Sequence, residues 1–223
     1  MRGGVIAVGG AVLIAAAAAS LFLAREPRSA KVQQHPHRVI EKPYAPLPAA
    51  ASKGREFLTK AQVQQALSSR TLDRPVKSLL AVQKPMQFGD YQWNDRAIPA
   101  GPTWIRVDLG SQIISVFRAG HEIGTSVIVY GGDNKETPGG TFHILARDRD
   151  HRSSIYDAAM PYTLRLTDDG VSIHGSAVRW GAATHGCIGV PLEFARRLFD
   201  EARVGDEVVI VPVGRGSVAL TTS

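Results

Sequence analysis

Cysteine is nearly absent from this sequence. The 223 residues contain one thiol, at Cys187, so no disulfide can form within the chain. A structural zinc site is disfavoured, because His174, His185 and Cys187 could supply ligands but do not make up the four closely spaced ligands that such a site needs. We therefore expect no metal. In an exported chain, an odd cysteine indicates either pairing between molecules or a free reactive thiol.

Residues 85–223, which the sequence predicts to be folded, show no excess of basic residues. Residues 25–84 hold 12 Lys and Arg against 4 Asp and Glu, whereas residues 85–223 hold 13 against 16. No basic stripe with interleaved aromatic residues accompanies a folded unit, which argues against nucleic acid as a partner. The basic segment is typical of a solvated tether, and attraction to anionic lipid or wall polymer is the alternative.

Charge is absent from the N-terminal segment that follows Arg2. Residues 3–24 form a run of 22 without a charged side chain, which is long enough to cross a bilayer as a helix. The basic start and the small residues at 17–20 also resemble a secretory signal peptide. Positive charges flank both ends of the run, so they do not indicate which end would face the cytoplasm. We expect residues 1–24 to be an inner-membrane anchor or a signal peptide, with the rest in the periplasm or cell envelope.

The remaining chain divides by composition into four regions. Residues 25–53 contain five prolines and little hydrophobic periodicity, which is typical of an extended basic linker. Residues 54–100 form a short N-terminal region. A helical pattern predicts a helix over 55–69, which Thr59 could cap, and an apolar run follows at 76–82. Residues 101–213 form the main domain, and residues 214–223 a tail. No internal repeat is present.

Strand patterns dominate the main domain. Apolar residues alternate with polar ones from Trp104 to Leu109, and a turn then reverses the chain. Strands are expected at 104–109, 112–117, 122–130, 141–146, 162–166, 171–174 and 207–213. Apolar residues at helical spacing predict one helix, from Pro191 to near Gly205. The fold class is therefore mainly β with a small α component.

The chemistry of the sequence centres on Cys187, which follows His185 and Gly186 in a short loop. A cysteine attacks carbonyls as a thiolate, and a neighbouring imidazole is a common means of forming it. His174 ends its own strand, so a rigid element could aim it at the thiol, and we assign it as the base. His185, two residues before Cys187 on an extended segment, would orient the thiol or face the substrate. Gly186 and Cys187 offer successive N–H groups for an oxyanion.

The alternative is a structural cysteine. Free cysteine is among the most buried residue types, so Cys187 could be an inert core residue near two satisfied histidines. The flanking glycine and the second histidine favour the reactive interpretation.

The pattern "IHGS…THGCIGV" resembles the signature of the L,D-transpeptidases, which carry a YkuD-type catalytic domain. The stretches "IRVDLGSQIISVFRAGHEIGTSVIVYGG", "TPGGTFHIL" and "MPYTLRL" resemble the strands and turns that precede this signature in the family. The resemblance covers about Gly101 to Val213, half of the chain. It implies an L,D-transpeptidase-like β-sandwich with one helix after the catalytic cysteine loop.

The resemblance also implies a reaction. Cys187 would attack the carbonyl of the diaminopimelate residue in a peptidoglycan tetrapeptide stem, expel D-alanine and form a thioester, which an amine or water then resolves. His174 would move the proton, and the backbone carbonyl of Gly175 would orient its ring. Thr184, His185 and Gly186 would line the nucleophile loop. No organic cofactor is expected, peptidoglycan stem peptides are the partners, and carbapenem-type inhibitors should acylate the enzyme.

Further substrate contacts are expected from Tyr162, Arg179 and Trp180. Many family members carry Arg or Asn two residues after the cysteine, where this chain has Gly189, and Arg179 is a candidate substitute. Trp180 suits stacking on sugar or peptide as well as plain packing. The interval from His174 to Cys187 is short for the family, which implies a trimmed loop. A hydrolase of the same fold that cleaves a diaminopimelate-linked amide and a non-catalytic wall-binding module are the alternative functions.

Overall fold

The computed structural model describes residues 47, 49–132, 135–153 and 157–214. The expected anchor, almost all of the linker and the tail beyond Gly214 lie outside these residues. None of the helices in the described ranges is long and apolar enough to cross a membrane.

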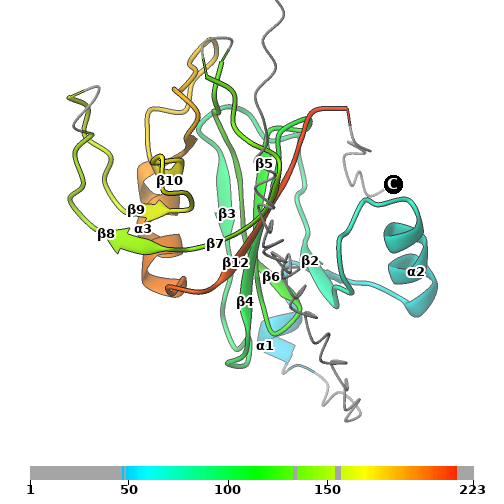
Figure 1. Cartoon of the computed structure of the whole chain (residues 1–223). Helices are drawn as coiled ribbons and strands as arrows, with labels where there is room; N and C mark the ends of the chain where they lie inside the picture. The colour runs from blue at the N-terminus through cyan, green and yellow to red at the C-terminus, as the bar shows by residue number, and fades with distance from the viewer. Residues whose placement is uncertain (1–46, 48, 133–134, 154–156, 215–223) are drawn as a thin grey trace, which may run out of the picture. The chain divides into compact units, whose positions relative to one another are not determined.

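Three helices and twelve strands make up the described chain (Figure 1). The helices are α1 (Ala49–Ser52), α2 (Lys60–Ser68) and α3 (Leu192–Glu201). The strands are β1 (Arg55–Phe57), β2 (Ser78–Leu80), β3 (Tyr91–Trp93), β4 (Thr103–Asp108), β5 (Ile113–Arg118), β6 (His121–Val127), β7 (Gly140–His143), β8 (Ala146–Asp148), β9 (Thr163–Arg165), β10 (Ser172–Gly175), β11 (Ile188–Val190) and β12 (Glu207–Val211). The predicted class, mainly β with a small α component, is confirmed.

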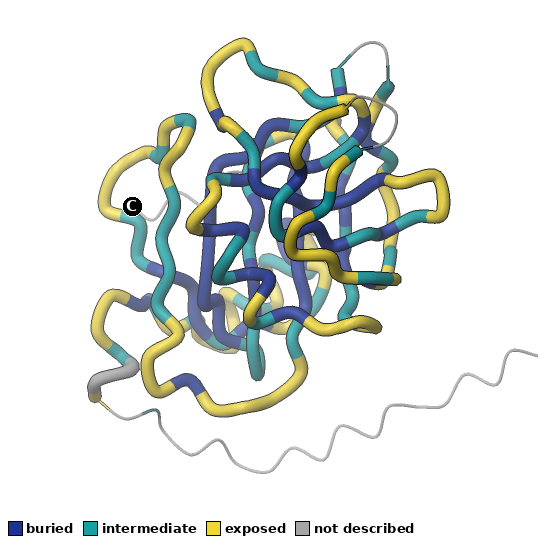
Figure 2. Tube along the Cα trace, turned by 90° about the vertical axis from the view of Figure 1, so that its left-hand side faces the viewer, coloured by how far each residue is buried: buried dark blue, intermediate teal, exposed yellow. Residues whose placement is uncertain are grey.

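The strands form two sheets. The larger runs β1-β2-β6-β5-β4-β12-β7, and β3 also pairs with β6. The smaller runs β11-β10-β9-β8. Strands β1, β2 and β3 come from the region before residue 101, so that region continues the large sheet of the main domain. Figure 2 shows the buried residues concentrated in the middle of the main body of the chain, with exposed residues in the loops around it.

Strand β4, in the large sheet, is buried on both faces. Ile105 and Val107 point into the main core, as their alternation predicts. The other face carries Arg106 and Asp108, which are only 9% and 4% exposed. Arg106 donates to Asp108 at 3.0 Å and to Asp73 at 2.9 Å, so the burial of these charges is compensated by pairing. The segment from α2 to β2 covers this face.

Helix α2 begins later than the sequence pattern predicts. Thr59 caps it, since its hydroxyl accepts the N–H of Gln62 while the Gln62 side chain accepts the N–H of Thr59. Residues 55–57 form strand β1 instead, because they pair with β2 and the Arg55 guanidinium donates to the carbonyls of Asn94 and Glu122. Tertiary contacts therefore override the local helical pattern.

Helix α3 links the two sheets. Its buried residues are Phe194, Ala195, Leu198 and Phe199. It packs against β9 and β10 of the small sheet (Figure 1). Phe194 on this helix meets Trp93 of the large sheet at 5.5 Å between ring centroids. Leu192, predicted for the same apolar face, is 53% exposed. Pro191 precedes the helix as its N-cap, since it needs no backbone hydrogen bond there.

Two predicted strands have different bounds for a physical reason. The run 141–146 is split, because β7 pairs with β12 of the large sheet whereas β8 pairs with β9 of the small one. The run 122–130 leaves the large sheet at Val127, and Val129 then bridges Gly189 next to the small sheet. Both breaks mark places where the chain passes between the sheets.

Candidate active site

His174 lies on β10, the strand between β9 and β11 in the small sheet, and is 8% exposed. Its Nδ1 lies 2.9 Å from the carbonyl oxygen of Gly175. A carbonyl can only accept, so Nδ1 carries the proton and Nε2 keeps its lone pair. Burial lowers the pKa of His174, and the charge of His151 lowers it further. The hydrogen bond to the Gly175 carbonyl raises the pKa and offsets part of this effect. The ring is therefore neutral at pH 7 and able to accept a proton through Nε2.

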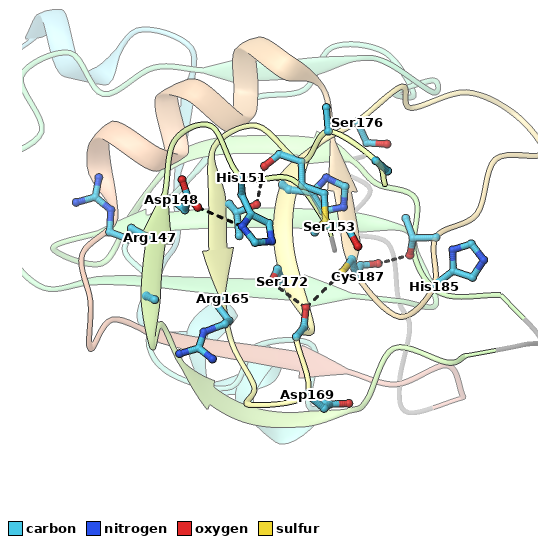
Figure 3. Close-up of a pocket in the computed structure, with 18 of the residues that line it drawn as sticks. Arg147, Asp148, His151, Ser153, Arg165, Asp169, Ser172, Ser176, His185 and Cys187 are labelled. Carbon is cyan, nitrogen blue, oxygen red and sulfur yellow. Dashed lines mark hydrogen bonds and ion pairs between the residues drawn. The ribbon is translucent and has the colours of Figure 1, made fainter. Parts of the chain in front are cut away.

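Cys187 directly precedes β11, which pairs in parallel with β10. Its thiol donates to the carbonyl of Gly170 at 3.7 Å, and the Ser172 hydroxyl donates to the same oxygen at 3.0 Å (Figure 3). Burial raises the pKa of Cys187, while the Ser172 N–H and the charge of Lys135 lower it. Within the described residues, no hydrogen bond joins the thiol to His174. The resting site therefore holds a neutral thiol and a neutral imidazole that line the same cavity.

The nucleophile loop is held from the segment that follows β6. Thr137 is the main bridge: its hydroxyl donates to the carbonyl of Gly186 at 3.0 Å and accepts the N–H of Gly131 at 2.9 Å. Thr184 donates its N–H to the carbonyl of Tyr130 at 3.0 Å, and its hydroxyl donates to the carbonyl of Cys187. These bonds fix the backbone on both sides of the thiol.

Gly186 has a φ of +94°, a conformation that residues with side chains rarely adopt. This turn ends the extended geometry that would have placed His185 and Cys187 on one face. His185 is exposed, and Figure 3 shows its ring directed away from Cys187. The expectation that His185 leans toward the thiol is therefore wrong in this structure.

Cys187 and His174 line one cavity of about 710 Å³, as do Thr184 and His185. A cavity of this size holds a small ligand or a peptide segment. Its wall is rich in charge of both signs, from Lys135, Arg147, Asp148, His151, Arg165, Asp168 and Asp169. Such a wall suits a ligand that carries several charged groups close together.

Three residues predicted to contact substrate lie outside this cavity. Tyr162 packs against Phe199, with 5.8 Å between ring centroids, at the edge of the main core. Trp180 is 85% exposed and packs edge-on against Phe88 in a separate hollow of about 550 Å³. Arg179 is exposed and lines neither space. The structure thus does not bring these three side chains to Cys187.

Gly189 pairs with His174 across β10 and β11 and with Val129 on its other side. A Cβ at this position would lie 2.7 Å from Cγ2 of Val129 and 2.8 Å from Cβ of Ser176. Val129 and Ser176 therefore occupy the space that a side chain at 189 would need. In this chain a residue larger than glycine at position 189 would therefore force Val129 or Ser176 to move.

The sequence reasoning missed Lys135, Thr137 and Ser172. Ser172 could have been found, because it precedes His174 by two on a strand and so shares its face. Thr137 begins the stretch "TPGGTFHIL", whose resemblance to the family marked the segment but not the contact with Gly186, which lies 49 residues further along the chain. Lys135 gave no local signal, because its approach to Gly186 depends on tertiary folding.

Residues 102–210 match the family model described as YkuD, the L,D-transpeptidase catalytic domain. These residues, just under half of the chain, therefore form an L,D-transpeptidase catalytic domain of the YkuD type, as the signature around Cys187 suggested. None of the curated proteins compared with the sequence matches it.

Several solved structures are similar to the chain. An L,D-transpeptidase from Stackebrandtia nassauensis is 22% identical with a TM-score of 0.47, and the match covers 53% of this chain and 60% of that one. The C442S mutant of the Enterococcus faecium L,D-transpeptidase is 25% identical with a TM-score of 0.45, covering 50% of each chain. L,D-transpeptidase 3 from Mycobacterium tuberculosis, in complex with a faropenem-derived adduct, is 18% identical with a TM-score of 0.46, covering 56% and 78%.

Proposed function

We propose that this chain is an exported peptidoglycan L,D-transpeptidase with Cys187 as its nucleophile. The observation that carries the proposal is the shared cavity of Cys187 and His174, in which the Nδ1–H of His174 is committed to Gly175 and Nε2 is left as a base. The family match supports the reaction class. The mixed charge of the cavity wall suits the carboxylates and amines of a stem peptide.

In the first half-reaction, Nε2 of His174 takes the thiol proton, and the Cys187 sulfur attacks the carbonyl that joins diaminopimelate to the terminal D-alanine. The backbone N–H groups of Gly186 and Cys187 would stabilise the oxyanion. The intermediate collapses as the C–N bond breaks, and the imidazolium returns its proton to the departing amine. D-Alanine leaves, and the stem remains on Cys187 as a thioester.

In the second half-reaction an amine attacks the thioester. It transfers a proton to Nε2 of His174, the new C–N bond forms, the C–S bond breaks and the thiol regains its proton. A diaminopimelate amine as acceptor gives a cross-link, a lipoprotein lysine gives an anchored protein and a free D-amino acid gives exchange. Water would give hydrolysis, which is the alternative function.

The direct experiment incubates the full chain, in mild detergent, with disaccharide tetrapeptides that contain diaminopimelate. We expect cross-linked dimers, or exchanged stems when a D-amino acid is added, together with released D-alanine. The Cys187→Ser variant is the control and should give none of these. Trimmed stems alone would identify a hydrolase, and unchanged stems would leave only a binding role. A carbapenem should add its mass to the wild-type chain and not to the variant.

We also propose that residues 1–24 anchor or export the chain, that residues 25–53 act as a spacer and that residues 101–213 are the catalytic domain. The support is the uncharged run of 22 residues and the proline-rich basic stretch that follows it. Replacing residues 25–52 by a much shorter segment should lower cross-linking in cells while leaving the activity of the purified chain intact. Unchanged cross-linking in cells would contradict the spacer role.

A further inference from the structure

Lys135 runs directly alongside the residue that precedes the nucleophile. Its Cγ, Cδ and Cε would lie 3.3 to 3.4 Å from a Cβ built on Gly186. The aliphatic part of Lys135 therefore occupies the space above Gly186, and its ammonium group extends past the nucleophile loop into the wall of the cavity. This placement follows from the loop after β6, which Thr137 ties to Gly186.

The Lys135 ammonium group pairs with Asp169 at 3.5 Å. Asp169 lies in the turn before β10, next to Gly170, whose carbonyl accepts the Cys187 thiol at 3.7 Å. The ion pair therefore spans the cavity wall beside the thiol, from the β6–β7 segment to the β9–β10 turn. Both side chains are solvated, with exposed fractions of 40% and 66%. An ion pair this exposed is weak, so a carboxylate entering the cavity can replace Asp169 as the partner of Lys135.

The other cations of the cavity are placed differently. Arg147 and Arg165 come from β8 and β9, and Arg165 has Asp168 at 3.9 Å. Figure 3 shows both guanidinium groups on the side of the cavity away from the nucleophile loop. Lys135 is the lining cation whose side chain lies against Gly186, the residue directly before Cys187. A ligand anion held within a few bonds of the attacked carbonyl therefore meets Lys135 before either arginine.

The proposed donor places an anion at that position. In a tetrapeptide stem the scissile amide joins the third residue to a terminal D-alanine, so a free carboxylate stands three bonds from the attacked carbonyl carbon. We propose that Lys135 binds this terminal carboxylate, taking it in exchange for Asp169, and thereby selects stems that end one residue after the scissile bond. This inference rests on the proposed function. A stem extended by a further residue, or capped as an amide, lacks the anion at this point.

The test compares two donors, the tetrapeptide stem and the same stem with its terminal carboxylate converted to a carboxamide. The full chain is used, in mild detergent, and kcat/KM is measured for each donor with wild type and Lys135→Met. Wild type should prefer the acid about two- to fivefold, as expected for an ion pair at a partly exposed lysine. In Lys135→Met, kcat/KM for the acid should fall toward the value for the amide, mainly because KM rises. The kcat/KM for the amide should change much less.

Three matched variants separate charge from position. Lys135→Arg should keep most of the preference for the acid, because it retains a cation at the same place. Asp169→Asn should lower KM for the acid, because the competing carboxylate is removed. Lys84→Met removes one positive charge at an exposed site outside the cavity and should leave the preference unchanged. A loss in Lys135→Met that is equal for both donors would overturn the proposal.

A second readout needs no transpeptidation. Iodoacetate and iodoacetamide both alkylate a thiolate with loss of iodide, but only iodoacetate carries a carboxylate next to the attacked carbon. The ratio of the iodoacetate rate to the iodoacetamide rate at Cys187 should fall several-fold in Lys135→Met. In Lys84→Met this ratio should stay near the wild-type value. If the ratio falls and no variant processes any stem, the anion site stands and the proposed function fails. If stems are processed but neither the donor preference nor this ratio depends on Lys135, the inference fails and the function stands.

Discussion

His174 donates its Nδ1–H to the carbonyl of Gly175, the next residue in the chain, at 2.9 Å. The bond fixes the ring and its tautomer through the backbone of β10, so no second side chain is needed to orient the base. It also assigns the proton-accepting role to Nε2. Together with the neutral thiol of Cys187, this relationship defines how the site should respond to pH.

The acylation rate should be constant through neutral pH. Burial lowers the pKa of His174, so the base becomes protonated only below its ordinary value of about 6.5. Burial raises the pKa of Cys187, so the thiol ionises only above its ordinary value of about 8.5. We expect a plateau in kcat/KM between these limits. The rate of iodoacetamide alkylation should rise with an apparent pKa above 8.5. A thiolate titrating between pH 5 and 7 would contradict the neutral resting pair.

Thr137→Val should impair both stability and acylation. The substitution leaves the N–H of Gly131 and the carbonyl of Gly186 buried without their partner, at a cost of about 1–3 kcal/mol in the free energy of unfolding. The nucleophile loop should lose its fixed geometry, and carbapenem acylation should slow. Thr137→Ser keeps the hydroxyl and is the control. Equal acylation rates in Thr137→Val and wild type would show that the bridge does not position Cys187.

Gly189→Asn should destabilise the fold. The new Cβ would collide with Cγ2 of Val129 at 2.7 Å and with Cβ of Ser176 at 2.8 Å, and overpacking of this kind costs about 1–3 kcal/mol. Ser176→Gly removes one of the two obstacles, so the double variant should recover part of the loss in thermal unfolding. If Gly189→Asn is as stable as wild type, the packing explanation for glycine at this position is wrong.

Glu122 and His121 should give opposite pH dependences of stability. Burial raises the pKa of Glu122 to about 7, and burial lowers that of His121 to about 4, helped by the charges of Lys77 and Arg55. Between about pH 4.3 and 7 the folded state keeps a proton on Glu122 that the unfolded state loses, so this stabilisation disappears as pH rises. Between pH 6.5 and about 4 the unfolded state binds a proton that His121 in the folded state does not, so this stabilisation disappears as pH falls.

The two effects oppose each other in the wild type, and single variants should reveal each one. Relative to wild type, Glu122→Gln should become more stable as pH rises from 4.3 to 6.5, and His121→Asn should become less stable over the same range. Each slope is at most about 1.4 kcal/mol per pH unit. Urea unfolding at several pH values measures both. Two slopes of the same sign would contradict the assignment.

The hairpin of β4 and β5, the helix α3 and the pairing of a cysteine loop with a strand-borne histidine could all be predicted from sequence. These features depend on local periodicity and on a compact motif, which a single stretch of sequence contains. Strands β3 and β11 could not be predicted, because three-residue strands carry almost no periodic signal and exist here only through pairing with β6 and β10. The burial of Arg106 could not be predicted either, because it depends on pairing with Asp73, which lies in a distant segment of the chain.

The residues of the candidate site also fall into two groups, those that the sequence indicated and those whose placement depends on tertiary folding. The residue types at Cys187 and His174 and their places in the sequence motif indicate the chemistry that we propose for them. The direction of His185 was mispredicted because the positive φ of Gly186 interrupts the extended segment. Lys135 was missed because its approach to Gly186 comes from tertiary folding of the loop after β6.

The most direct measurement is the intact mass of the full chain, mixed with a tetrapeptide donor and quenched in acid. We predict an adduct on Cys187 with the mass of the stem minus D-alanine, and D-alanine released in at least the same amount, because each turnover of the thioester releases more. The adduct should be absent from Cys187→Ala, and it should form about 10²–10⁴ times more slowly in His174→Gln. D-Alanine release by Cys187→Ala at the wild-type rate, or an unmodified wild-type chain with no release, would contradict the account.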